Sequence, residues 1–120
     1  MAGMVEPTLA RFFTKDFVAK NPKAVARMGD MIRTTSVDGH IGCCEALRGL
    51  AEGVNLPKIS VPALFVGGEH DLGGPPDLMR AMAAATPGAR YIMIEGAGHI
   101  SNIEAPERFL AAIAPFLAAH

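Results

Sequence analysis

The sequence predicts an α/β fold in which helices come first and a short parallel sheet follows. Two continuous apolar runs, at residues 63–66 and 91–94, are typical of strands that are covered on both faces. Each run is followed by a glycine-containing turn and then by a helical pattern. Strands that alternate with helices in this way form βαβ units with a parallel sheet. A two-stranded sheet is marginal in water, so we expect these strands to be one end of a larger sheet.

The chain before Pro57 shows helical periodicity. Asn21-Pro22 predicts a helix start, with Asn21 as the N-cap and Pro22 at the first helical position. Another helix is predicted after Ser36, and residues 48–58 are expected to form a connection. A helix nearer the N-terminus is predicted from apolar residues at helical spacing: Val5, Leu9, Phe12 and Phe13.

Two helices are predicted to cover the strands. The first spans residues 77–86, and its buried face is expected to hold Leu78, Met82 and Ala85. Pro106 opens the last helix, and Pro115 should kink or end it. The side chains of this helix that we expect to point inward are Phe109, Leu110, Ile113, Phe116 and Leu117.

Composition disfavours several classes of function. The formal net charge is −1 and aromatic residues make up 6% of the chain, so neither a basic groove nor a base-stacking surface for nucleic acid is indicated. No apolar run approaches the roughly 20 residues that cross a bilayer, and the N-terminus has no signal-peptide pattern. Cys43 and Cys44 are adjacent, which disfavours a disulfide between them. We therefore expect a cytoplasmic protein that binds neither nucleic acid nor a membrane.

Two loops carry the residues that are best suited to take part in a reaction. Asp71 follows the first predicted strand and His99 follows the second. Because the carboxyl ends of parallel strands meet at one edge, we expect the imidazole to donate a hydrogen bond to the carboxylate. Such a carboxylate fixes the tautomer of the histidine and stabilises the imidazolium that forms when it accepts a proton. The four histidines have no metal-ligand spacing, so no zinc site is expected.

Several stretches of the sequence resemble a known family. "VPALFVGGEHD", "PGARYIMIEGAGH" and "NIEAPERF" resemble the C-terminal third of α/β-hydrolases, in which the strand-end Asp and the last His belong to a Ser-Asp-His triad. "TLARFFTKDF", "NPKAVARMGDMI" and "GHIGCCEALR" are similar to the helical cap of 3-oxoadipate enol-lactonases. The resemblance implies an incomplete α/β-hydrolase fold, with a helical cap (lid) at residues 1–56 and a C-terminal βαβα part of the core at residues 57–120.

The same resemblance implies a parent activity. That activity is hydrolysis of 3-oxoadipate enol-lactone, a small lactone of aromatic catabolism, with Asp71 as the acid and His99 as the base of the triad. No metal or organic cofactor is implied. The family pattern also needs a G-x-S-x-G nucleophile, and none of the serines lies in such a frame, so we expect the chain alone to be nearly inert. The serines are Ser36, Ser60 and Ser101.

Other polar residues allow two interpretations. Arg48 either meets a substrate carboxylate or is an exposed helical arginine, and Glu69 and His70 are expected to be loop polar groups rather than ligands. Cys43 and Cys44 lie in a helical pattern, which favours two half-buried thiols over a catalytic cysteine. Ser101 and Asn102 are expected to cap the turn before the last helix, and Glu104 is expected to be a favourable charge at the N-terminus of that helix.

A non-catalytic function is the main alternative. The missing strands would leave an unpaired sheet edge and an exposed apolar face, which are association surfaces. The chain would then form a homo-oligomer, or a partner chain would supply the N-terminal half. A third hypothesis, a small helical ligand-binding module, has less support in the sequence.

Overall fold

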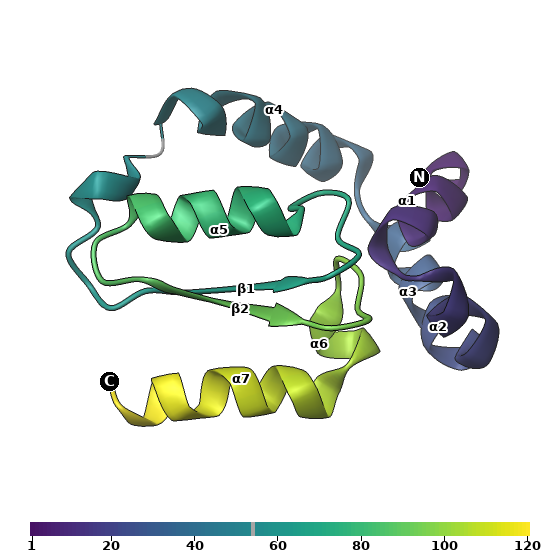
Figure 1. Ribbon diagram of the computed structural model, residues 1–120. Helices are drawn as coiled ribbons and strands as arrows, with labels where there is room; N and C mark the ends of the chain where they lie inside the picture. Colours follow the sequence, from purple (N-terminus) through teal and green to yellow (C-terminus); the bar gives the residue numbers. More distant parts are fainter. Residues whose placement is uncertain (54) are drawn as a thin grey trace.

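The chain forms a small parallel sheet with helices on both faces and a group of helices beyond one end of the strands (Figure 1). The computed structural model describes residues 1–53 and 55–120. In chain order the elements are η1 (Ala2–Met4), α1 (Val5–Phe12), α2 (Lys15–Lys20), α3 (Pro22–Thr34), α4 (Val37–Gly53), η2 (Leu56–Lys58), β1 (Leu64–Gly68), α5 (Pro76–Ala85), β2 (Arg90–Ile94), α6 (Ser101–Glu104) and α7 (Pro106–Ala118). This arrangement confirms the predicted α/β class.

The sheet consists of β1 and β2, which run parallel and in register. Leu64 lies opposite Arg90 and Gly68 lies opposite Ile94, so both strands end at the same edge. Helix α5 covers one face and α7 covers the other (Figure 1). Strand β1 continues two residues past the end predicted at Val66, because its last residue passes against the neighbouring loop. A Cβ at Gly68 would overlap the carbonyl oxygens of Ala97 and Gly98, so only glycine fits there.

The N-terminal helices pack around a small apolar core of their own. Its buried side chains are Val5, Leu9, Phe13 and Ile32, which joins α1 to α3. A Cβ at Gly29 would lie 3.3 Å from the Cγ1 atom of Val5, so this glycine lets the two helices approach closely. The apolar stripe predicted for the first helix therefore forms the core between α1 and α3, with Phe12 half-buried at its border.

The start of α3 differs from its prediction in one respect. Asn21 does occupy the N-cap position and Pro22 the first helical position, but the Asn21 side chain accepts no hydrogen bond from α3. Its amide instead donates to the carbonyl oxygen of Phe17 at 3.3 Å. The backbone amide of Asn21 donates to the same carbonyl at 2.9 Å, so the side chain adds a second hydrogen bond at the end of α2.

Helix α4 is longer than the sequence indicated. Ser36 precedes it, and the Ser36 hydroxyl accepts a hydrogen bond from the Gly39 amide at 3.3 Å, as a capping residue does. The helix continues to Gly53, so the expected connection at residues 48–58 is wrong for its first six residues. Residue 54, within that segment, lies outside the described residues. Gly39 and Gly42 lower the helix propensity of this segment, but the helix continues through both of them.

The buried face of α5 is rotated from the predicted one. Met79, Met82, Ala83 and Thr86 face inward at helical spacing. Leu78 is 49% exposed and Ala85 is exposed too, so these two predictions are wrong. The predicted stripe and the observed one both have a 3.6-residue period. Packing against the sheet selects the stripe that contains Ala83 and Thr86.

Helix α7 also departs from its predicted pattern. Phe109, Ile113 and Phe116 are half-buried, whereas Leu110 and Leu117 are exposed. The sheet has only two strands, so the helix extends past the surface that could cover these leucines. Pro115 does not end α7, which runs on to Ala118. A proline this close to the end of a helix removes only one backbone hydrogen bond of the last turn.

Among the described residues, none of the helices has both the length and the apolarity that a membrane span requires.

Candidate active site

The loops after β1 and β2 bring Asp71 and His99 together. Asp71 comes three residues after the end of β1 and His99 five residues after the end of β2. The Nδ1 atom of His99 lies 2.8 Å from the Oδ1 atom of Asp71, which confirms the predicted hydrogen bond. An ionised carboxylate can only accept, so Nδ1 carries the proton and donates it. In the neutral imidazole this leaves Nε2 unprotonated and able to accept a proton.

Asp71 is held by the backbone of its own loop. Its side chain is 8% exposed, and Oδ1 also accepts hydrogen bonds from the amides of Gly73 at 2.7 Å and Gly74 at 2.9 Å. Burial alone would raise the pKa of Asp71, but the hydrogen bonds from Gly74, His99 and Gly73 outweigh it and leave the pKa below its ordinary value. The carboxylate is therefore ionised at neutral pH and oriented toward His99.

A set of hydrogen bonds, here called the loop brace, joins the two loops. The amide of Glu69 donates to the Ile94 carbonyl at 3.0 Å, and the amide of His70 donates to the Ala97 carbonyl at 2.9 Å. The Glu69 carboxylate accepts from the amide of Gly96 at 2.8 Å. Gly96 has a φ of +66°, a left-handed conformation that glycine adopts without strain. Glu69 and His70 are thus loop polar groups, as the sequence indicated, and Glu69 has a bracing contact that was not foreseen.

The imidazole of His99 lies against Phe12, the last residue of α1. The ring of Phe12 is 5.5 Å from the His99 ring between centroids, at an angle of 30°. The amide of Ile100 donates to the Phe12 carbonyl at 3.2 Å. The side chain of His99 is still 39% exposed, so its free nitrogen is open to a reacting group.

Glu104 does not act as the sequence suggested. Its carboxylate accepts hydrogen bonds from the amide of Gly98 at 2.8 Å and from the amide of Thr14 at 3.3 Å, and it also bonds the Thr14 hydroxyl. It therefore joins the His99 turn to the N-terminal helices rather than stabilising the start of the last helix. The turn before the last helix is α6, and neither Ser101 nor Asn102 caps it: its N-cap position is Ile100, and Ser101 is buried as its first residue.

Arg48, the residue predicted to bind substrate, is exposed on α4. It belongs to the second half of that helix, which leads back toward η2 and the start of β1 (Figure 1). None of the described contacts joins it to Asp71 or His99. The structure therefore brings together Asp71 and His99 but not Arg48.

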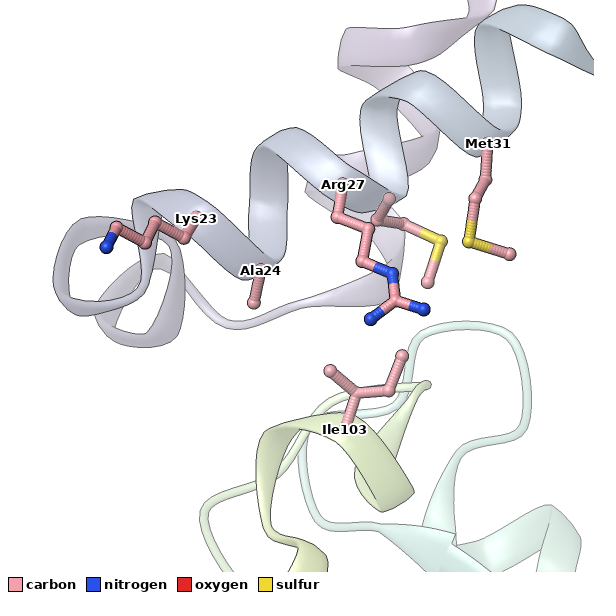
Figure 2. A pocket seen from close by; sticks show the side chains of 6 residues that line it. Lys23, Ala24, Arg27, Met31 and Ile103 are labelled. Carbon is pink, nitrogen blue, oxygen red and sulfur yellow. The ribbon is translucent and has the colours of Figure 1, made fainter.

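A cavity of about 570 Å³ lies between α3 and α6. Figure 2 shows the guanidinium of Arg27 and the side chain of Met31 extending from α3 toward Ile103 of α6. The lining combines two cations with apolar side chains and contains no acidic residue: Lys23, Ala24, Arg27, Met28, Met31 and Ile103. Sequence reasoning missed this cavity because its two walls are about 80 residues apart in the chain.

The cysteines and the other polar groups show no second site. Cys43 and Cys44 are both exposed and unpaired on α4, so the expectation that they are half-buried is wrong. The Sγ atom of Cys44 lies 3.7 Å from the Nε2 atom of His40, one helical turn earlier. Within residues 1–53 and 55–120, no three His, Cys, Asp or Glu side chains are grouped to hold a metal ion.

Comparison with known proteins places this geometry in a family. Residues 5–106 match the family model for the alpha/beta hydrolase fold. The chain is 27% identical over 114 residues to 3-oxoadipate enol-lactonase 2 of Acinetobacter baylyi, covering 92% of this chain and 41% of that protein. It also matches a putative non-heme bromoperoxidase of Mycobacterium tuberculosis, with 39% identity over 61 residues, 51% of this chain and 23% of that protein.

Solved structures give a closer likeness. The enol-lactonase from Burkholderia xenovorans LB400 superposes with a TM-score of 0.89 at 34% identity, covering 98% of this chain and 45% of that one. A thermophilic esterase from Thermogutta terrifontis gives a TM-score of 0.82 at 29% identity, over 97% of this chain and 43% of that one. The chain thus spans less than half the length of these relatives. By its fold, its sequence and its superposition on these enzymes, the chain belongs to the α/β-hydrolase family and carries an incomplete form of that fold.

Proposed function

We propose that the chain is the C-terminal part of an α/β-hydrolase that opens lactones or esters, with Asp71 and His99 as the acid and base of a Ser-Asp-His triad. The observation that carries this proposal is the 2.8 Å hydrogen bond between His99 Nδ1 and a buried, ionised Asp71. It leaves Nε2 as the proton acceptor, which is the nitrogen that a general base of this kind uses.

The nucleophile comes from outside this chain. Ser36 and Ser60 are exposed and lie in no strand-end turn, and Ser101 is buried in α6. In the complete site, His99 Nε2 removes the proton from a serine hydroxyl, whose oxygen attacks the lactone carbonyl and forms an acyl-enzyme. Asp71 stabilises the imidazolium, which returns the proton to the leaving oxygen. Water, activated by the same nitrogen, then releases the acid and restores the serine.

We propose an acidic enol-lactone as the substrate, namely 3-oxoadipate enol-lactone of aromatic catabolism. Two kinds of observation support this choice. Relatives found by sequence and by structure are named enol-lactonases. The cavity between α3 and α6, whose lining includes neither Asp71 nor His99, offers Lys23 and Arg27 to an anionic ligand, together with apolar side chains for its carbon skeleton. Arg48, by contrast, does not line this cavity.

A chimera tests the proposed roles directly. The chain would be fused behind the N-terminal part of the Burkholderia enol-lactonase, and hydrolysis of the enol-lactone would be followed. We expect His99→Ala to lower turnover by roughly 10⁴-fold or more, and Asp71→Asn by about 10⁴-fold. His70→Ala is the matched control, because this exposed histidine is the neighbour of Asp71 but makes no bond to it. Full activity of the His99→Ala chimera would refute the assignment.

The chain by itself should show almost no hydrolase activity. Loss of the nucleophile from a triad lowers turnover by on the order of a million-fold. We expect hydrolysis of p-nitrophenyl acetate by the purified chain to equal that of its His99→Ala variant. Turnover well above that variant would mean that a group within the chain acts as the nucleophile.

The second candidate function is assembly without catalysis. A specific observation favours it: an open apolar groove lies between β1 and α7. Its lining residues are Leu64, Val66, Phe109, Ile113, Phe116 and Leu117. A second copy, or a partner chain with the N-terminal half, would cover it.

We propose that the protein lies in the cytoplasm, where two exposed free thiols stay reduced.

A further inference from the structure

The turn that carries His99 is clamped on both sides by groups from outside it. Before His99, the Gly98 amide donates to the Oε2 atom of Glu104 at 2.8 Å. After His99, the Ile100 amide donates to the Phe12 carbonyl at 3.2 Å. The catalytic candidate thus sits between two anchored peptide groups, one held by α6 and one by the end of α1.

The Glu104 carboxylate joins these two anchors. Oε2 holds Gly98, and Oε1 accepts from the amide of Thr14 at 3.3 Å and bonds its hydroxyl. Thr14 lies two residues after the end of α1 and caps α2, accepting from the Phe17 amide at 3.2 Å. We call these three residues, Thr14, Gly98 and Glu104, the Glu104 clasp. It connects the N-terminal helices to the His99 turn across 90 positions of sequence.

The packing shows that the clasp leaves little freedom to the turn. A Cβ at position 98 would lie 2.8 Å from the Phe12 carbonyl oxygen and 3.0 Å from Oε2 of Glu104. Only glycine fits between α1 and Glu104, so the backbone before His99 touches both. Hydrogen bonds to a carboxylate are about twice as strong as neutral ones, which makes this anchor stiffer than an ordinary turn contact.

We propose that Glu104 is a positioning residue for His99. By fixing the Gly98 amide and tying it to Thr14, the carboxylate sets the direction in which the imidazole leaves the backbone and so keeps Nδ1 on Asp71. Its removal leaves Asp71 and its loop unchanged but lets the His99 ring rotate, so that the Nδ1–H and Nε2–H tautomers mix. This inference rests on the proposed function only for its effect on catalysis.

Nitrogen-15 NMR of the His99 ring in the intact chain tests the proposal without any assay of activity. The unsubstituted chain should show a single Nδ1–H tautomer and a slowly exchanging Nδ1 proton at low field. We expect Glu104→Ala to give a mixture of tautomers and to speed exchange of that proton by roughly tenfold or more, the ratio that loss of a hydrogen bond to a charged group predicts. Glu104→Gln, which keeps one acceptor oxygen, should change the tautomer mixture and the exchange rate less than Glu104→Ala does.

Two further variants keep the test decisive. Glu107→Ala removes an exposed acid in the first turn of α7 and should leave the His99 signals unchanged. If Glu104→Ala does not fold, Thr14→Val is the second variant. It removes the hydroxyl bond to Glu104 and, with the same oxygen, the cap of α2, but it keeps the Thr14 amide bond to Glu104 and should therefore give a smaller shift in the same direction. Unchanged His99 signals in a folded Glu104→Ala or Thr14→Val protein would overturn the proposal, as would an equal effect of Glu107→Ala. An inactive chimera with the expected NMR shifts would instead refute the proposed function alone.

Discussion

The carboxylate of Asp71 shows how two opposing effects are resolved at one residue. Burial favours its neutral form, whereas two glycine amides and the imidazole favour the ionised form, and the hydrogen bonds prevail. The loop Gly73-Gly74 provides these amides at close range, because a Cβ at Gly74 would lie 3.4 Å from Oδ2 of Asp71. The charge that the histidine needs beside it is therefore maintained by the backbone.

This balance predicts the acid dependence of stability. The pKa of Asp71 is lower in the folded chain than its ordinary value of 3.8, so the unfolded chain binds its proton first as the pH falls. The stabilisation is fully present above that ordinary value and is lost below it, as the pH falls through the folded pKa. Asp71→Asn should lower the free energy of unfolding at pH 7 by on the order of 1–3 kcal/mol.

Urea midpoints between pH 2 and pH 7 measure this effect. The unsubstituted chain should lose stability toward acid more steeply than Asp71→Asn, and the two curves should converge at the acid end. Asp77→Asn is a suitable control, since this carboxylate is exposed on α5. Parallel curves for the Asp71→Asn variant and the unsubstituted chain would show that Asp71 is not the group responsible.

The close packing around Gly68 leads to a second prediction at the residue scale. A Cβ there would overlap two carbonyl oxygens of the backbone, which cannot move as a flexible side chain can. We expect Gly68→Ala to destabilise the chain by roughly 3 kcal/mol or more, at the upper end of overpacking costs. Gly67→Ala, one residue earlier, meets the Met79 side chain at 3.4 Å and the Tyr91 hydroxyl at 3.6 Å, which are ordinary contact distances, and should cost much less. Thermal unfolding followed by circular dichroism compares the two, and equal losses would contradict this account.

Sequence reasoning identified Asp71 and His99 because the ends of parallel strands fix where their side chains meet. It could not identify the role of Glu104, whose partner Thr14 lies 90 residues away and whose local position equally suited a helix N-terminus. Arg48 was predicted from its charge and from the resemblance to the lactonase cap, and neither determines which side of a helix faces a cavity.

At the scale of elements, periodicity predicted which helices exist better than which of their faces is buried. The stripe of α1 was identified correctly, because Val5 and Leu9 are large and their neighbours are polar or small. In α5, apolar residues surround most of the helix, so two overlapping stripes satisfy the same period. Only the sheet beneath decides between them, and it accommodates Ala83 and Thr86.

Paired substitutions on α5 test this assignment of faces. Ala83→Asp would bury an unpaired carboxylate and should lower the free energy of unfolding by about 3 kcal/mol or prevent folding. Leu78→Asp places the same charge on an exposed position and should change it by no more than about 0.5 kcal/mol. Chemical denaturation of both variants measures the difference. The reverse order would mean that the face predicted from the sequence is the buried one in solution.

At the scale of the whole molecule, the chain is more extended than a complete domain of its size. Its radius of gyration is 15.8 Å, whereas a compact domain of this length has one of about 13.6 Å. Helix α4 lies outside α5 as an outer layer, and the sheet is only two strands wide (Figure 1). The prediction of only two strands indicated an incomplete sheet from the sequence. How much apolar surface α7 would leave uncovered depended on the three-dimensional arrangement.

This open shape predicts self-association when no partner chain is present. Light scattering over a concentration series should give a dimer or larger species, because the groove along α7 needs a cover. Leu117→Glu should weaken the association by roughly tenfold or more. Val61→Glu is the matched control, since both side chains are 65% exposed but Val61 lies outside the groove. A monomer at all concentrations would leave a partner chain with the N-terminal half as the explanation for the groove.

The loop brace makes the Asp71–His99 pair independent of the rest of the hydrolase fold. Its hydrogen bonds run between Glu69, His70 and the β2 turn, all within this chain. A nucleophile brought by a second polypeptide would therefore find the acid and the base already paired, and that polypeptide would have to bring its hydroxyl oxygen to His99 Nε2 together with an oxyanion hole. Turnover would then report docking itself, and the chain would serve as one half of a split-enzyme sensor whose signal appears only when the two halves meet.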